Sequence, residues 1–164
     1  MRIFLVRHAD ADAEIPEGLG DDARALTARA RPLALSHFTA LAERMEKVDL
    51  ILCSPLVRAV QTATILSLAI KHEGSLRANR SLLPDMPVGS LDAVLTEHAG
   101  ENLVLVGHQP SMGAMASHLL GMQNFPKPVN PGTVIALERP DGEPGAQARL
   151  LFYAAPNQSV LESL

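Results

Sequence analysis

Three short apolar segments of the 164-residue chain each lead into residues that could handle a phosphate group. Arg7 and His8 follow the first segment, Arg58 lies shortly after the second, and His108 follows the third. Arginine is a permanent cation whose planar fork of donors matches phosphate oxygens. A neutral histidine nitrogen is a competent nucleophile toward phosphorus. Together these four residues would suit phosphoryl transfer, which demands mainly positioning and charge stabilisation.

The elements that would have to position these residues alternate between strands and helices. Segments 3–6 and 103–106 are unbroken apolar runs, typical of central strands in a parallel sheet, and segment 49–53 reads as a further strand with an apolar run over 50–53. A helix is predicted after each of them. In an open parallel sheet the carboxyl ends of the strands share one edge, where ligands bind. We therefore expect the two histidines and two arginines to converge there.

The helix boundaries are predicted from local signals. One helix is expected to begin at Pro32, after a preliminary turn capped by Thr27, and a second to begin with Ser54 as its N-cap and Pro55 as its first residue. Two further helices are expected, one over about 89–99 and one from Pro110 that ends at Gly121.

The alternation of elements predicts an α/β fold, a three-layer sandwich around a mostly parallel central sheet. Segments 133–138 and 148–153 read as an antiparallel pair at the sheet edge, joined through a turn at 140–145 that is rich in proline and glycine. Residues 71–87 fit a short strand or a loop, and residues 9–26 a long loop. We expect a single domain over residues 1–164.

The three strand-end motifs resemble those of the histidine phosphatase superfamily, to which phosphoglycerate mutases also belong. Segment 5–10 (LVRHAD) is similar to its Arg-His motif, segment 54–63 (SPLVRAVQTA) to its Ser-Pro-x-x-Arg segment, and segment 106–110 (VGHQP) to its second histidine motif. The resemblance spans about residues 1–139 and implies a phosphoglycerate mutase-like fold. The short chain and the His-Gln-Pro form most resemble the SixA-type phosphohistidine phosphatases.

The resemblance implies a role for each matched residue. His8 would be the nucleophile and would form a transient phosphohistidine, while Arg7 and Arg58 would clamp the phosphoryl oxygens. His108 would complete the catalytic set and stabilise the transferring group. The backbone N–H of Gln109 would add a further phosphate donor.

The sequence also departs from the family pattern. Ala9 stands where a glycine usually follows the Arg-His pair, and the glutamate acid of the larger relatives has no convincing counterpart. Asp85 is the best candidate acid. A missing strong acid fits an imidazole leaving group, which needs less help than an alkoxide. We therefore expect a metal-independent phosphatase that acts on phosphohistidine in a protein, without a cofactor. A phosphatase for small phosphomonoesters and a non-catalytic phosphate-binding module are the alternatives.

The remaining reactive side chains have plainer interpretations. Cys53 ends an apolar run, which favours a buried thiol over a nucleophile. Asp10, Asp12 and Glu14 read as a solvated loop or a substrate-access rim rather than a metal site. The other four histidines, His37, His72, His98 and His118, are expected at the surface.

The composition of the chain argues against some classes of binding partner. The net charge is −4, only 3% of residues are aromatic and no basic block occurs, which argues against a nucleic-acid partner. No stretch approaches the roughly 20 apolar residues of a membrane helix. The single cysteine is consistent with a reducing compartment. We expect a cytoplasmic monomer whose partner is a phosphohistidine-bearing protein.

Overall fold

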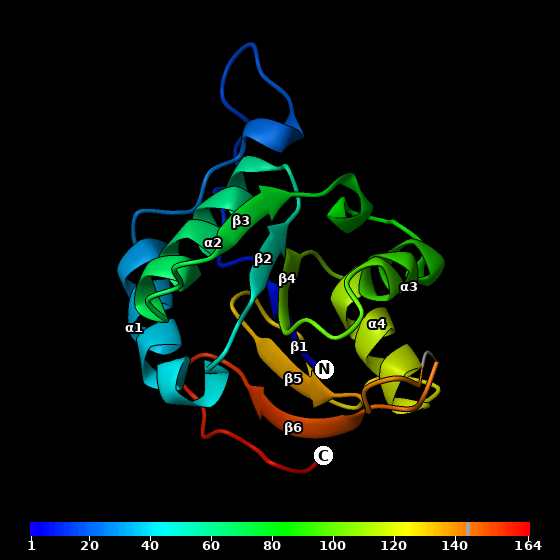
Figure 1. Cartoon of the computed structure of the whole chain (residues 1–164). Helices are drawn as coiled ribbons and strands as arrows, with labels where there is room; N and C mark the ends of the chain where they lie inside the picture. Colours follow the sequence, from blue (N-terminus) through cyan, green and yellow to red (C-terminus); the bar gives the residue numbers. More distant parts are fainter. Residues whose placement is uncertain (144) are drawn as a thin grey trace.

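The strands form one mixed sheet in the computed structural model, which describes residues 1–143 and 145–164 (Figure 1). Pro144, in the predicted 140–145 turn, lies outside the described residues. The strand order is β3-β2-β4-β1-β5-β6. The strands are β1 (Arg2–Arg7), β2 (Leu50–Cys53), β3 (Ser75–Ala78), β4 (Leu103–Gly107), β5 (Val134–Glu138) and β6 (Arg149–Ala154).

The pairing of these strands confirms the predicted fold class. Strands β1, β2, β3 and β4 are mutually parallel, while β5 pairs antiparallel with β1, and β6 pairs antiparallel with β5. For the weakly patterned region 71–87, which fitted either a short strand or a loop, the structure shows a short edge strand, β3. Its exposure explains the weak pattern, because only Leu76 of its four side chains is not fully exposed.

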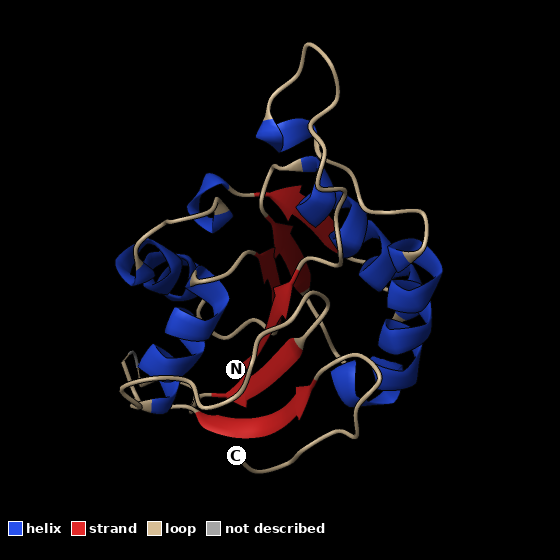
Figure 2. Ribbon diagram, turned by 180° about the vertical axis from the view of Figure 1, so that it is seen from behind, coloured by secondary structure: helices blue, strands red, loops and turns tan. Residues whose placement is uncertain are grey.

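Helices cover both faces of the sheet and make a three-layer sandwich (Figures 1 and 2). α1 (Ala30–Leu41) and α2 (Val57–Ala69) pack on one face, and α3 (Val88–Glu97) and α4 (Ser111–Leu120) on the other. Three 3-10 turns, η1 (Asp21–Ala23), η2 (Ala42–Met45) and η3 (Arg80–Leu82), lie in the connections. Within the described residues, no helix has both the length and the apolar character to cross a membrane.

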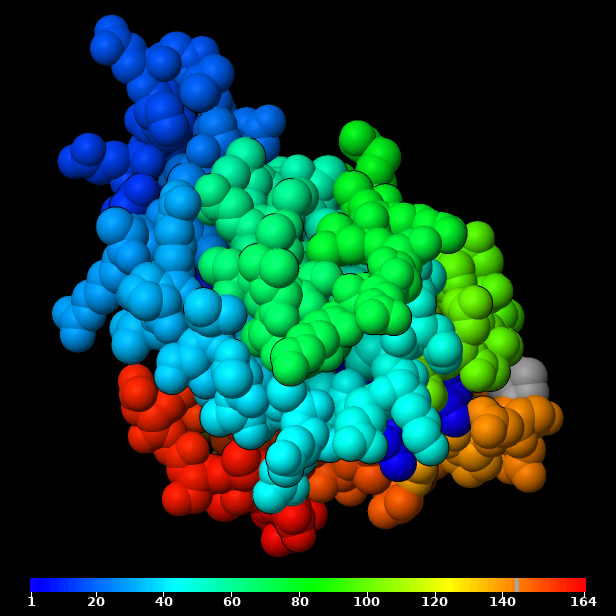
Figure 3. All heavy atoms as spheres, turned by 60° about the vertical axis from the view of Figure 1, so that its left-hand side comes forward, coloured from blue at the N-terminus to red at the C-terminus, as the bar shows by residue number. Residues whose placement is uncertain are grey.

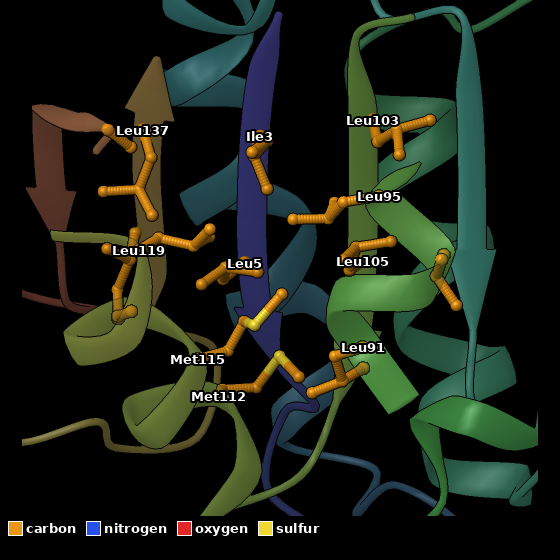
Figure 4. Close-up of a cluster of buried hydrophobic side chains, with 14 of the residues drawn as sticks. Ile3, Leu5, Leu91, Leu95, Leu103, Leu105, Met112, Met115, Leu119 and Leu137 are labelled. Atoms are coloured by element: carbon orange, nitrogen blue, oxygen red, sulfur yellow. The ribbon is translucent and has the colours of Figure 1, made fainter. Parts of the chain in front are cut away.

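The side-chain alternation of the central strands builds two cores, one on each face. Ile3 and Leu5 of β1 pack against α3 and α4, as Figure 4 shows, while Phe4 and Val6 point to the α1 and α2 face. All four are 0% exposed, so both faces of β1 are apolar. Each such side chain contributes about 1.5–3 kcal/mol by burial. The uninterrupted apolar run therefore follows from a strand that has helices on both sides.

The starts of α1 and α2 differ from prediction by two residues each. α1 begins at Ala30, not Pro32, and the Thr27 hydroxyl accepts a hydrogen bond from the Ala30 N–H at 3.0 Å. Pro32 still lies in the first turn, where its missing N–H has no helical partner to lose. α2 begins at Val57, so Ser54 and Pro55 are not its N-cap and first residue.

The physical reason lies in the Ser54 hydroxyl. It accepts from the Leu56 N–H at 3.2 Å and contacts His108, so it stabilises a turn ahead of the helix.

The predicted end of α4 is confirmed, because Gly121 adopts a left-handed conformation with φ of 67°.

Register brings the strand ends together. Arg7 of β1 pairs with Gly107 of β4, and Cys53 of β2 pairs with Val106. The residues after these positions emerge at one edge of the sheet. The connection between β1 and α1 extends beyond this edge, as the blue segment in Figures 1 and 3 shows.

Candidate active site

The two histidines of the strand-end motifs face each other. The ring centroids of His8 and His108 lie 5.1 Å apart with the planes inclined at 57°. Backbone bonds fix the position of His8, whose N–H donates to the Gly107 carbonyl at 3.0 Å and whose carbonyl accepts from the Gly132 N–H at 3.1 Å. The two imidazoles are thus held by the two adjacent central strands.

The tautomer of His8 follows from its hydrogen bond. Nδ1 lies 2.7 Å from the carbonyl oxygen of Ala9, an acceptor only, so Nδ1 carries the proton and Nε2 carries the lone pair. Burial, together with the charges of Arg58, Arg7 and Arg24, lowers the pKa of His8 to about 4, against the raising effect of the Ala9 carbonyl. At neutral pH His8 is therefore an uncharged imidazole with a free Nε2.

His108 is neutral for similar reasons. Burial lowers its pKa to about 3, and the neighbouring His8, Arg58 and Arg7 act in the same direction, while Asp21 opposes them. Its Nε2 lies 2.8 Å from the Ser54 hydroxyl. Its Nδ1 is buried and has no hydrogen-bond partner in the described residues.

The arginines are anchored by carbonyls and by one carboxylate. Arg7 donates from Nη1 to the Val129 carbonyl at 2.9 Å. Arg58, 5% exposed, donates from Nη1 to the Asp21 carbonyl at 3.0 Å and from Nη2 to the Asp21 carboxylate at 3.1 Å. The Nε atoms of both arginines are buried without a partner among the described residues.

Three buried nitrogens without partners belong to residues near His8, since the charges of Arg7 and Arg58 act on its pKa and the ring of His108 lies 5.1 Å from its ring. Buried donors are nearly always satisfied, so each exception calls for an explanation. Here Nε of Arg7, Nε of Arg58 and Nδ1 of His108 all lack partners and come from the end of β1, the start of α2 and the end of β4. Two guanidinium groups and an unpaired imidazole nitrogen beside a nucleophilic nitrogen are suited to bind a tetrahedral oxyanion.

Asp21, the carboxylate that reaches this site, was not predicted from the sequence. It lies in η1, and its pKa is lowered chiefly by the hydrogen bond from Arg24, so it is ionised at neutral pH. The sequence singled out Asp10, Asp12 and Glu14 in the same loop, and all three are exposed. Asp21 is distinguished from these three only by the three-dimensional path of the loop, which brings it to Arg58.

Thr62 links the nucleophile to α2. Its hydroxyl accepts from the Ala9 N–H at 3.0 Å and donates to the Arg58 carbonyl at 2.7 Å, and the side chain is fully buried. It therefore fixes the Ala9 peptide, whose carbonyl sets the tautomer of His8. Thr62 is part of the 54–63 motif, but the sequence predicted no contact for it.

Two predicted residues lie outside this set of contacts. The side chain of Gln109 turns back to accept from the Gly113 N–H at 2.8 Å, and the proposed role of its backbone N–H stays a prediction. Asp85 is exposed between η3 and α3, with a φ of 62°. Its role as an acid also stays a prediction.

The other reactive side chains are placed as follows. Cys53 is 0% exposed, and burial raises the pKa of its thiol to about 11, so the predicted buried thiol is confirmed. The expected surface position is wrong for His37, which is half-buried because its ring packs on that of Phe38, with centroids 5.5 Å apart. His72 and His98 are also partly buried, whereas His118 is exposed.

Comparison with known proteins fits this geometry. The model of the histidine phosphatase superfamily (branch 1) matches residues 3–79, which carry the first two motifs. No curated protein matches the sequence.

Several solved structures share the fold. The protein histidine phosphatase SixA complexed with tungstate superposes with a TM-score of 0.83 at 20% identity, over 95% of this chain and 97% of that chain. A candidate phosphohistidine phosphatase SixA from Agrobacterium tumefaciens gives 0.81 at 23% identity, over 94% and 97%. A mycobacterial glucosyl-3-phosphoglycerate phosphatase complexed with VO3 gives 0.65 at 19% identity, over 91% and 96%. The chain thus has the phosphoglycerate mutase-like fold.

Proposed function

Because the model of the histidine phosphatase superfamily (branch 1) matches residues 3–79, we propose that the chain is a member of this superfamily and hydrolyses phosphohistidine in a protein through a transient phospho-His8, without a metal. The observation that carries this proposal is the set of unpaired donors around His8, namely Nε of Arg7, Nε of Arg58 and Nδ1 of His108. They supply an anion site next to a nucleophilic nitrogen.

The first step forms a bond between His8 Nε2 and phosphorus. Nε2 is unprotonated at neutral pH and Nδ1 is held by Ala9, so the lone pair is available for attack. The phosphorus–nitrogen bond of the substrate breaks, its electron pair moves to the departing imidazole, and that nitrogen takes up a proton from solvent. Arg7 and Arg58 offset the charge on the phosphoryl oxygens during transfer.

The second step releases phosphate. A water oxygen bonds to phosphorus, and the Nε2–phosphorus bond breaks with its electrons returning to His8. One water proton stays on the released phosphate and the other passes to solvent. The nucleophile is thereby regenerated in its neutral form.

Phosphohistidine as the substrate is supported by the carboxylate at the site. Asp21 is ionised and bound to two arginines, so it is a poor proton donor at neutral pH. An alkoxide leaving group would need such a donor, whereas an imidazole can leave with less help. The good superposition on SixA structures also supports this substrate class.

Rapid-quench mass spectrometry tests the proposal. A protein phosphorylated on histidine with phosphoramidate is mixed with the enzyme, and phosphate release and phosphate on His8 are followed. We expect turnover that a chelator leaves unchanged and that His8→Ala abolishes, with His118→Ala as the exposed control. Full activity in His8→Ala would refute the mechanism. Faster turnover of sugar phosphates would favour the small-phosphomonoester phosphatase, and phosphate binding without turnover would favour a binding module.

A further inference from the structure

Ser54 is the protein group in hydrogen-bond contact with the ring of His108. Its Oγ lies 2.8 Å from His108 Nε2, and both side chains are buried, Ser54 at 0% and His108 at 3% exposed. Ser54 follows β2 directly, while His108 follows β4, the neighbouring strand. The contact therefore joins the ends of two paired strands beneath the site.

The protons of this contact can be assigned by counting donors and acceptors. The Ser54 oxygen already accepts from the Leu56 N–H at 3.2 Å, and a hydroxyl has one proton to donate. The acceptor within its reach among the described residues is His108 Nε2. If His108 donated instead, the serine proton would be buried without a partner, which is unfavourable.

The consequence falls on the opposite ring nitrogen. A neutral imidazole that accepts at Nε2 must carry its proton on Nδ1. Nδ1 is the buried His108 atom that lacks a partner, and the ring lies 5.1 Å from that of His8. Burial and the cationic neighbours keep the pKa of His108 near 3, so the ring is neutral and its tautomer matters.

We propose that Ser54 is a positioning residue that holds His108 in the Nδ1–H tautomer, so that this N–H donates to the phosphoryl group during transfer. The catalytic consequence of this inference rests on the proposed function. The assignment of the tautomer is independent of it. The opposite tautomer would turn a nitrogen lone pair toward the phosphoryl oxygens, replacing an attraction with a repulsion. Ser54 thus acts on the reaction through His108 without touching the substrate.

The tautomer is tested directly by nitrogen-15 NMR of the histidine side chains at pH 7. In the wild-type protein we expect His108 to show a protonated Nδ1 and an unprotonated Nε2. In Ser54→Ala the two nitrogens should move toward averaged values or exchange roles. A wild-type His108 protonated at Nε2 would overturn the proposal without reference to any variant or any activity.

Kinetics test the consequence. We expect Ser54→Ala to lower kcat for a histidine-phosphorylated protein roughly tenfold to a hundredfold with little change in KM, since the defect concerns the transition state. Ser54→Thr keeps the hydroxyl and should recover most of kcat. Ser117→Ala is the matched control, because Ser117 is also buried but donates to the Ala114 carbonyl within α4.

The outcomes separate this inference from the proposed function. A Ser54→Ala enzyme that folds and keeps kcat within twofold of the wild type would overturn the positioning role. A wild-type enzyme that does not form phospho-His8 would refute the proposed function, while the NMR assignment would still decide the role of Ser54 in setting the tautomer.

Discussion

The two active-site histidines should make the free energy of unfolding fall steeply below pH 6.5. Burial, reinforced by the arginine charges, lowers the pKa of His8 to about 4 and that of His108 to about 3, from 6.5 for an unperturbed histidine. The unfolded chain therefore binds protons first as the pH falls. Stability is complete above the unfolded pKa and is lost progressively as the pH falls toward the folded values.

The magnitude follows from the width of this window. At pH 5, about 1.5 pH units below the unfolded pKa, each histidine costs about 2 kcal/mol of stability, because one unit corresponds to about 1.4 kcal/mol. Together they remove about 4 kcal/mol between pH 7.5 and pH 5, a large share of the roughly 5–15 kcal/mol of a typical domain.

Urea unfolding in phosphate-free buffer at pH 7.5 and pH 5.0 measures this loss, since bound phosphate would stabilise the folded state. His8→Asn and His108→Gln should each reduce the pH-dependent loss by about 2 kcal/mol. His118→Gln is the control, because that side chain is 51% exposed and stays hydrated in the folded protein. If both active-site variants lost as much stability as the wild type, the buried, neutral state of these imidazoles would be refuted.

Two further predictions concern Cys53 and Arg58. The buried Cys53 thiol, whose pKa is raised to about 11, should resist iodoacetamide at pH 8 in the native protein and react after unfolding in urea; mass spectrometry that finds it alkylated in the native state would contradict its burial. Arg58→Lys keeps the charge but loses the planar fork, so phosphate should inhibit the enzyme about tenfold to a hundredfold less tightly, as expected for one charge-assisted hydrogen bond of about 1.5–3 kcal/mol. The exposed Arg29→Lys is its control, and equal inhibition constants for the two variants would argue against direct phosphate contact.

The sequence predicted those parts of the fold whose signals are local. The apolar run ending at Val6 and the run ending at Val106 mark central strands, because both faces of each are buried. Gly121 marks a helix end because glycine adopts a left-handed conformation at little cost. For strand β3 the sequence did not distinguish a strand from a loop, because an exposed edge strand has little hydrophobic pattern.

The candidate site was predictable in its strand-end residues but not in the contacts around them. Arg7 and His8 needed only the rule that strand ends share an edge. Ser54 was misread as a helix cap because its competing partner, His108, lies 54 residues away in sequence. Asp21 could not be distinguished from the other loop acids, because its contact with Arg58 depends on the path of a loop without regular pattern.

The pairing of Arg7 with Gly107 has a consequence for how this scaffold can diversify. Inserting or deleting one residue in either central strand would displace an imidazole by about 3.3 Å and turn it to the opposite side of the sheet. A change in the length of either strand would therefore disrupt the sheet and the active site at the same time. The protruding segment between β1 and α1 is anchored at Asp21, Arg24 and the buried Leu26, but its exposed residues 13–20 carry no such register constraint, so new substrate preferences can arise there while the reaction is preserved.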